Sequence, residues 1–462
     1  MRSDVVLAAP HTRLGQLQRG RGRGFLDALR AGPAARDDVL QSILECIVRD
    51  PRIDAQIESR ARYLTELLVA LDVPIDPIVQ ALRRGPDTSS GSGEPSEPQV
   101  QLGHEVLACA WVAGHRATRS WFAAKPDESI CAAVAGQVVG GEWARLVELP
   151  RGLRKPALAF LLEDADSAAV TPGMRGSIRP PGPLTECSVD ELLELARGKS
   201  GRELLRELCA RGDEASRERM ADCVRSDLVY GRVRLAAHAL GTMGDERLLD
   251  LAREHFALED EPLDAARRLS GFERMRRAAL ASYVRHLPEA RQRQLAREWH
   301  ERGDYFETVA GSLFAETADA DDRMQLEAFV KERLGLGDSG WGVISELDAL
   351  AHIGDPRSAD LLVMVAEQAG YAHARRRALH GLALLASAGE LSDAQNAALT
   401  EALWDCEDEA AADACAFLPM LDKAARARVV DLAASPLVDD ELAVRARRRL
   451  ARGGESVGPP LA

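Results

Sequence analysis

Two thirteen-residue segments, 110 positions apart, share one order of residue types. The first, ALGTMGDERLLDL, spans 239–251, and the second, ALAHIGDPRSADL, spans 349–361. Glycine readily takes the left-handed conformation that ends a helix, and an aspartate after it can cap the next helix. Each segment therefore predicts two antiparallel helices joined by a tight turn. The predicted turn residues are Gly244, Asp245, Gly354 and Asp355.

A single hairpin of two helices cannot bury its apolar face alone, so it must stack on neighbouring hairpins. A spacing of 110 residues is about three periods of a helix-pair repeat. Aromatic residues make up only 4% of the 462 residues, and strand-forming residues are sparse beside alanine, leucine and arginine, which favours helix. We therefore predict an all-α protein, an α-solenoid of helical hairpins preceded by a small helical module.

A segment rich in Gly, Ser, Pro and Glu divides the chain near its N-terminal end. It reads GPDTSSGSGEPSEPQVQ and has too few apolar residues to order itself, so it predicts a disordered linker. Before it, Leu64, Leu67 and Leu68 recur at helical spacing. The predicted parts are a helical module at 1–84, the linker at 85–101, a helical region at 102–187 with an irregular loop at 171–183, the solenoid at 188–452 and a flexible tail at 453–462.

Three stretches resemble the HEAT-repeat family, especially its short bacterial form with the signature A-L-G-x-I-G-D-P-R. Two of them are Ala239–Arg247 and Ala349–Arg357, and in the third Asp439, Val444 and Arg445 match the start of a repeat. The resemblance covers roughly the whole predicted solenoid, strongly at these three places. It implies an armadillo-like curved solenoid that binds other macromolecules along a groove, and hence a protein-binding scaffold.

Enzymes of the HEAT-like class suggest a metal site as one alternative. The deoxyhypusine hydroxylase type holds two irons with His-Glu pairs placed just before the A-L-G. The corresponding positions here are Arg234–Leu235, Ile344–Ser345 and Arg376–Arg377, none of which can ligate iron. We therefore predict no metal and no cofactor.

HEAT-like DNA glycosylases supply the other enzymatic alternative, because they press a cationic groove and aromatic side chains against a damaged duplex. Trp111, Trp121 and Trp143 cluster in the sequence and fit either such a surface or a core. A net charge of -14 repels a polyanion over most of the surface, which disfavours nucleic acid as a partner.

Two histidines fall at equivalent repeat positions, in AHALG and LHGLA. An arginine lies one helical turn before each of them. Such residues could form a polar ladder along one groove, or the histidines could be partly buried and satisfied by neighbouring carbonyl groups. The residues of this predicted ladder are Arg234, His238, Arg376 and His380.

The C-terminal part of the predicted solenoid is strongly acidic. Residues 386–441 hold 13 acidic residues against three basic ones, and DCEDEAAAD lies within them. The acids could form a solvated face beside a polar terminal cap, or a docking surface for a partner protein with a basic surface. The candidate docking residues are Asp405, Glu407, Asp408, Glu409 and Asp413.

An Arg-Gly segment, QRGRGRGF at 18–25, allows two interpretations: an RNA-binding stretch, or a flexible, solvated entry to the first helix.

The eight cysteines never form a C-x-x-C and indicate reduced thiols in a reducing cytoplasm. No window is apolar enough to span a membrane. We predict a non-catalytic scaffold or adaptor that binds another protein in a bacterial cytoplasm; the alternative is a HEAT-like nucleic-acid-binding or DNA repair enzyme of the glycosylase type.

Overall fold

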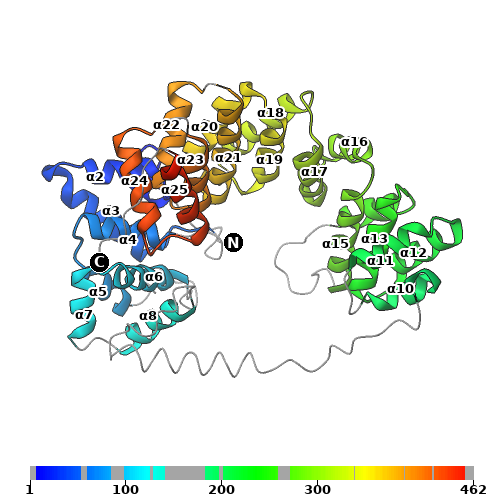
Figure 1. Cartoon of the computed structure of the whole chain (residues 1–462), viewed down its shortest axis with the longest axis horizontal. Helices are drawn as coiled ribbons and strands as arrows, with labels where there is room; N and C mark the ends of the chain where they lie inside the picture. The colour runs from blue at the N-terminus through cyan, green and yellow to red at the C-terminus, as the bar shows by residue number, and fades with distance from the viewer. Residues whose placement is uncertain are drawn as a thin grey trace. The chain divides into compact units, whose positions relative to one another are not determined.

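The computed structural model describes residues 7–53, 60–84, 98–124, 128–140, 183–196, 201–258, 271–337, 339–389, 391–418 and 421–452. All regular secondary structure in these ranges is helical, so the all-α class is confirmed for them (Figure 1). The chain divides into two compact units. The first contains Met1–Val170 and Glu327–Ala462, and the second contains Thr171–Leu326.

The first unit combines helices from both ends of the chain. Its N-terminal helices are α1 (Arg13–Gln18), α2 (Gly22–Arg30), η1 (Pro33–Ala35), α3 (Arg36–Val48), α4 (Ala61–Ala70), α5 (Asp76–Arg84), α6 (Pro98–Val112), α7 (Arg116–Ala123) and α8 (Glu128–Gly140). Its C-terminal helices are η5 (Trp341–Val343), α19 (Ile344–Ile353), η6 (Pro356–Ser358), α20 (Ala359–Gln368), α21 (Ala372–Ala388), α22 (Asp393–Glu401), η7 (Ala402–Trp404), α23 (Asp408–Phe417), α24 (Lys423–Ala434) and α25 (Asp440–Arg452).

The C-terminal helices of this unit pack in chain order. Helices α19, α21, α23 and α25 contact one another in succession, while α20 contacts both α21 and α22. Leu350, Leu382 and Leu442, on three of the successive helices, are buried. Because α21 contacts α23 and α23 contacts α25, side chains on the facing sides of these helices lie close together.

The second unit contains η4 (Leu184–Glu186), α10 (Val189–Leu195), α11 (Gly201–Ala210), α12 (Glu214–Ser226), α13 (Tyr230–Thr242), α14 (Leu249–Phe256), α15 (Gly271–Arg285), α16 (Glu289–Trp299) and α17 (Asp304–Thr317). Helix α18 (Arg323–Gly335) begins in this unit and ends in the first. The rings of Phe256, Trp299 and Phe306 meet edge to face, with centroids 5.6–5.8 Å apart. These rings form an aromatic cluster in the core of the second unit.

Both repeated segments contain the left-handed glycine. Gly244 has φ 68° and Gly354 has φ 66°. In both, the aspartate carboxylate accepts the backbone N–H two residues ahead. The α-helix starts only four residues after the aspartate, at Leu249 in the first segment. Asp245 and Asp355 therefore cap a short turn that leads into the helix, instead of capping the α-helix itself as the sequence predicts.

The Arg-Gly segment at 18–25 is packed against the C-terminal helices. Arg19 and Arg21 are buried, and their guanidinium groups donate to the carbonyl oxygens of residues 368 and 367, at 3.4 and 3.1 Å. The Gly20 carbonyl accepts the N–H of Cys406 at 2.9 Å. The interpretation as a flexible, solvated entry is therefore wrong, and the buried Arg19 and Arg21 do not form an exposed Arg-Gly stretch.

These contacts place helices of the predicted N-terminal module and of the predicted solenoid in one compact unit. The two units thus differ from the division predicted from composition. Residues 85–97, 171–182 and 453–462, which hold most of the predicted linker and loop and the whole predicted tail, lie outside the described residues. Helix α6 begins at Pro98 and so includes the last four residues of the predicted linker.

Candidate functional site

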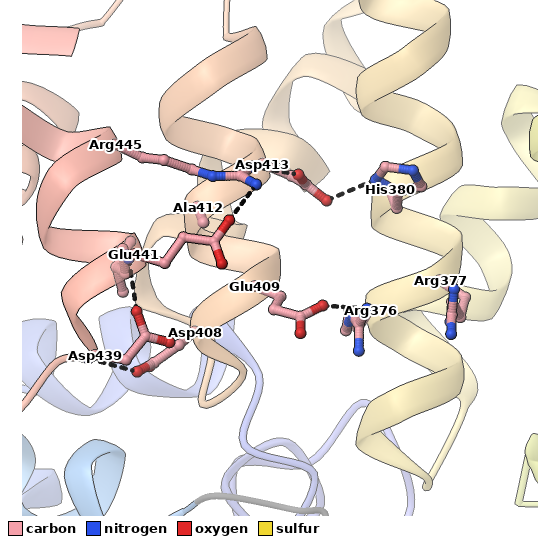
Figure 2. Close-up of a pocket in the computed structure, with 11 residues that line it drawn as sticks. Arg376, Arg377, His380, Asp408, Glu409, Ala412, Asp413, Asp439, Glu441 and Arg445 are labelled. Atoms are coloured by element: carbon pink, nitrogen blue, oxygen red, sulfur yellow. Dashed lines mark hydrogen bonds and ion pairs between the residues drawn. The ribbon is translucent and has the colours of Figure 1, made fainter. Parts of the chain in front are cut away.

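Three successive helices of the first unit, α21, α23 and α25, line a pocket of about 230 Å³ (Figure 2). Its lining is charged almost throughout. Five carboxylates face three guanidinium groups and one imidazole, so the pocket is acidic overall. The lining residues are Arg376, Arg377, His380, Asp408, Glu409, Ala412, Asp413, Asp439, Glu441, Leu442 and Arg445.

Each of the three helices presents two charged or polar side chains four residues apart, a spacing that places both on one helix face. The pairs are Arg376 with His380, Glu409 with Asp413, and Glu441 with Arg445. From one helix to the next the positions advance by 33 and then 32 residues. The pocket is therefore built from two rows of equivalent repeat positions.

The inner row is held together through one buried carboxylate. His380 Nδ1 lies 2.8 Å from Asp413 Oδ2, and the Arg445 guanidinium donates to Asp413 Oδ1 at 3.1 Å (Figure 2). Arg445 also donates to Glu441 Oε1 at 2.6 Å. In the outer row Arg376 forms an ion pair with Glu409. Cation and anion therefore alternate across the three helices in the inner row, while the outer row contains one ion pair and a second carboxylate, Glu441.

The pKa of His380 is raised above its ordinary value, chiefly by its hydrogen bond to Asp413, against the opposing effect of burial. The carboxylate of Asp348, on α19, acts in the same direction and Arg376 in the opposite one. The charged imidazole stabilises the fold fully below the unfolded pKa of about 6.5, and this stabilisation is lost as the pH rises through the raised pKa.

The equivalent histidine of the second unit lies in the opposite environment. The ring centroid of His238 is 3.5 Å from that of His286, and no carboxylate accepts from it among the described residues. Burial, His286 and Arg234 together lower its pKa to about 4. The predicted ladder of Arg234, His238, Arg376 and His380 is thus split between two units, and only its second half lines the pocket.

We expect the two histidines to titrate far apart in an NMR experiment on the ring protons. His380 should titrate above about 6.5 and His238 near 4. Asp413→Asn should lower the pKa of His380 and leave that of His238 unchanged, because only His380 contacts Asp413. A His380 that titrates below its ordinary range would contradict the ion pair.

The predicted acidic docking surface is corrected by the structure. Asp405 is 3% exposed and Glu407 is buried, so neither lies on a solvated face. The Asp405 carboxylate accepts two hydrogen bonds from the buried Arg375, at 2.9 and 3.1 Å. Arg375 compensates the buried charge of Asp405, and the acidic segment itself does not reveal this partner.

Three of the five predicted acids do line the pocket: Asp408, Glu409 and Asp413. Asp408 also forms an ion pair with Arg62, which does not line the pocket, at 2.7 Å. Sequence reasoning missed four of the charged lining residues: Arg377, Asp439, Glu441 and Arg445. The signal that could have found Glu441 and Arg445 is the period of 32–33 residues between charged pairs spaced four apart; Arg377 and Asp439 lie outside this pattern.

The tryptophans considered for an enzymatic alternative do not line this pocket. Trp111 is buried in α6, and Trp143 lies outside the described residues. In the part of the chain that the structure describes, no group of three or more His, Cys, Asp or Glu side chains is arranged to hold a metal ion. Within the same residues, no helix has both the length and the apolar composition needed to cross a membrane.

Comparison with known proteins adds no relative: no family model matches the chain, and no curated protein matches it.

Proposed function

We propose that this protein is a non-catalytic scaffold of the HEAT type, an α-solenoid whose acidic pocket docks a basic segment of a partner protein. The observation that carries the proposal is the pocket itself, in which α21, α23 and α25 contribute side chains at corresponding positions to one pocket with five carboxylates. A repeated helical hairpin with a left-handed glycine at its turn supports the HEAT assignment.

The inner and outer acids of the pocket differ in burial, and this difference fits docking of a basic segment. Asp413, in the inner row, is buried and already neutralised by His380 and Arg445, so it orders the wall. The rim acids Glu409 and Glu441 are also paired, with Arg376 and Arg445, but their side chains are 57% and 67% exposed. Exposed carboxylates at a rim attract a cationic partner from solution and need not be desolvated to do so.

The test measures the affinity of a fluorescein-labelled oligoarginine peptide for the full chain and for a Glu409→Lys/Glu441→Lys variant. We expect at least about a tenfold loss of affinity, equivalent to 1.4 kcal/mol, because attraction at two rim positions becomes repulsion. Far-UV circular dichroism should not change, since both side chains are exposed.

The matched control is Asp37→Lys/Glu332→Lys, which changes the net charge equally at two exposed acids outside the pocket. We expect about a twofold effect at most from this control at 0.15 M salt, where distant charges are screened. An equal loss in both double variants would show that only net charge matters and would overturn the docking pocket. Tight, salt-sensitive binding of alkylated duplex DNA with base release would replace the scaffold proposal by a repair enzyme.

A further inference from the structure

A second and larger pocket, of about 340 Å³, lies in the first unit between its N-terminal helices and α24. Its walls come from α2, α4, η7 and the residues that end α24. Most of its lining is apolar, in contrast to the docking pocket. The apolar lining residues are Phe25, Leu29, Val69, Ala70, Ala113, Trp404, Pro436 and Leu437.

Two of these side chains are exposed large hydrophobic residues. Leu29 is 39% exposed and Val69 is 41% exposed, and both lie on helices whose remaining apolar residues are largely buried. Concave apolar sites of 300–1,000 Å³ with a few convergent polar groups are typical of small-molecule binding in proteins. The volume and the lining therefore match a site for a ligand with an apolar body.

The charged groups inside the pocket are compensated. Arg428 forms an ion pair with Glu66 at 2.7 Å, and it donates from Nε to the carbonyl of Leu403 at 3.0 Å. Glu66 also pairs with Arg62, at 3.3 Å. A ligand anion would have to compete with Glu66 for Arg428, which makes an anionic head group unfavourable here.

Asp431 is the exception. It lies one helical turn after Arg428 on α24 and lines the same pocket. Its carboxylate makes no ion pair and no side-chain hydrogen bond with any residue that the structure describes. It is exposed at the rim, yet burial by the surrounding protein raises its pKa, against the opposing effect of Arg428. The pocket thus carries one carboxylate that forms no ion pair within the described residues, although Arg428 lies near enough to lower its pKa.

We propose that this pocket binds a small organic cation, a primary amine on an apolar or aromatic body. The body would fill the space between Phe25, Val69 and Trp404, and the ammonium group would pair with Asp431. Charge complementarity selects the amine over a carboxylic acid of the same shape, because the lining holds one unmatched negative charge. The inference is independent of the docking pocket, since the two pockets share no lining residue.

The experiment uses three probes with the same carbon skeleton and different head groups: phenethylamine, phenethyl alcohol and phenylacetate. Binding to the full chain is followed by the indole N–H signal of Trp404, which the Trp404→Phe variant assigns. For probes of this size, dissociation constants on the order of millimolar are expected. We expect phenethylamine to bind most tightly, followed by the alcohol, and phenylacetate most weakly.

Asp431→Asn should weaken phenethylamine binding about tenfold and leave the alcohol unchanged, because it removes one charge-assisted hydrogen bond and little volume. Asp37→Asn, an exposed acid outside the pocket, is the matched control and should have no effect. Val69→Phe should reduce binding of both the amine and the alcohol by filling the pocket from an exposed position, where folding tolerates the change.

Three outcomes would overturn the proposal. Equal affinity for the amine and for phenylacetate would mean that Asp431 does not select charge. No shift of the Trp404 signal with any probe would mean that the pocket does not bind a small ligand. Binding of a peptide rich in lysine and leucine at Trp404, with none of the three probes bound, would assign this surface to protein docking instead.

Discussion

Replacing Asp405 with alanine is expected to lower the free energy of unfolding of the first unit by about 3–5 kcal/mol. The alanine would leave the Arg375 guanidinium buried without the carboxylate that accepts two of its hydrogen bonds. Removing one partner of a buried ion pair exposes the full desolvation cost of the other. The measurement is urea denaturation, with hydrogen exchange of α21 and α23 to assign the transition to this unit.

Glu409→Ala provides the matched control, because this acid is also paired with an arginine of α21 but is exposed. Its loss should cost at most about 1 kcal/mol. A double variant, Arg375→Met/Asp405→Leu, should recover much of the stability, since well-packed apolar residues often replace a buried ion pair at little cost. Equal effects of Asp405→Ala and Glu409→Ala would contradict the burial of the Arg375–Asp405 pair.

The second large effect is expected from Gly22→Ala, at the first residue of α2. A Cβ atom there would lie far inside van der Waals contact with the carbonyl oxygen of Glu401. Backbone cannot rotate away as a flexible side chain can, so either α2 or the end of α22 must shift. We expect a loss of about 3 kcal/mol, the upper part of the range for overpacking, and faster amide exchange in residues 13–30.

Gly32→Ala controls for the substitution itself. Gly32 has φ -69°, and no atom lies within 4 Å of the position that its Cβ would take. The added methyl group should therefore change stability by at most about 1 kcal/mol, in the stabilising direction. If Gly22→Ala left both the unfolding transition and amide exchange of residues 13–30 unaltered, the close approach of α2 to Glu401 would not exist in solution.

Local features of this protein followed from the sequence because their causes are local. A glycine such as Gly354 can adopt a left-handed φ at little cost, and the carboxylate of Asp355 accepts a backbone N–H only two residues ahead. The all-α class follows from composition because helix propensity is also a local property of each residue. These interactions join atoms a few residues apart, so they depend little on what packs around them.

The pocket at α21, α23 and α25 was predictable in part. Its residue types and the i,i+4 spacing of Glu409 and Asp413 are visible in the sequence, but pairing with His380 depends on a register of 33 residues between neighbouring helices. The sequence hides that register, because the residue types at corresponding positions of α21, α23 and α25 differ. The acids of the pocket could therefore be named while their partners could not.

Local sequence by itself determined that this protein is helical, where its repeated turns lie and which segments are acidic. Only the tertiary structure decided which charges are buried. Arg62 binds the carbonyl of Asp405 from 343 positions away, and Arg19 binds a carbonyl 349 positions away. An arginine or an aspartate is ordinarily solvated, and its burial is tolerated only when a partner is brought to it by the fold. Hydropathy scores each residue by itself, so it assigns charged side chains such as Arg62 and Arg19 to the surface. Their burial depends on contacts between helices at opposite ends of the chain, and these contacts exist only once those helices have packed.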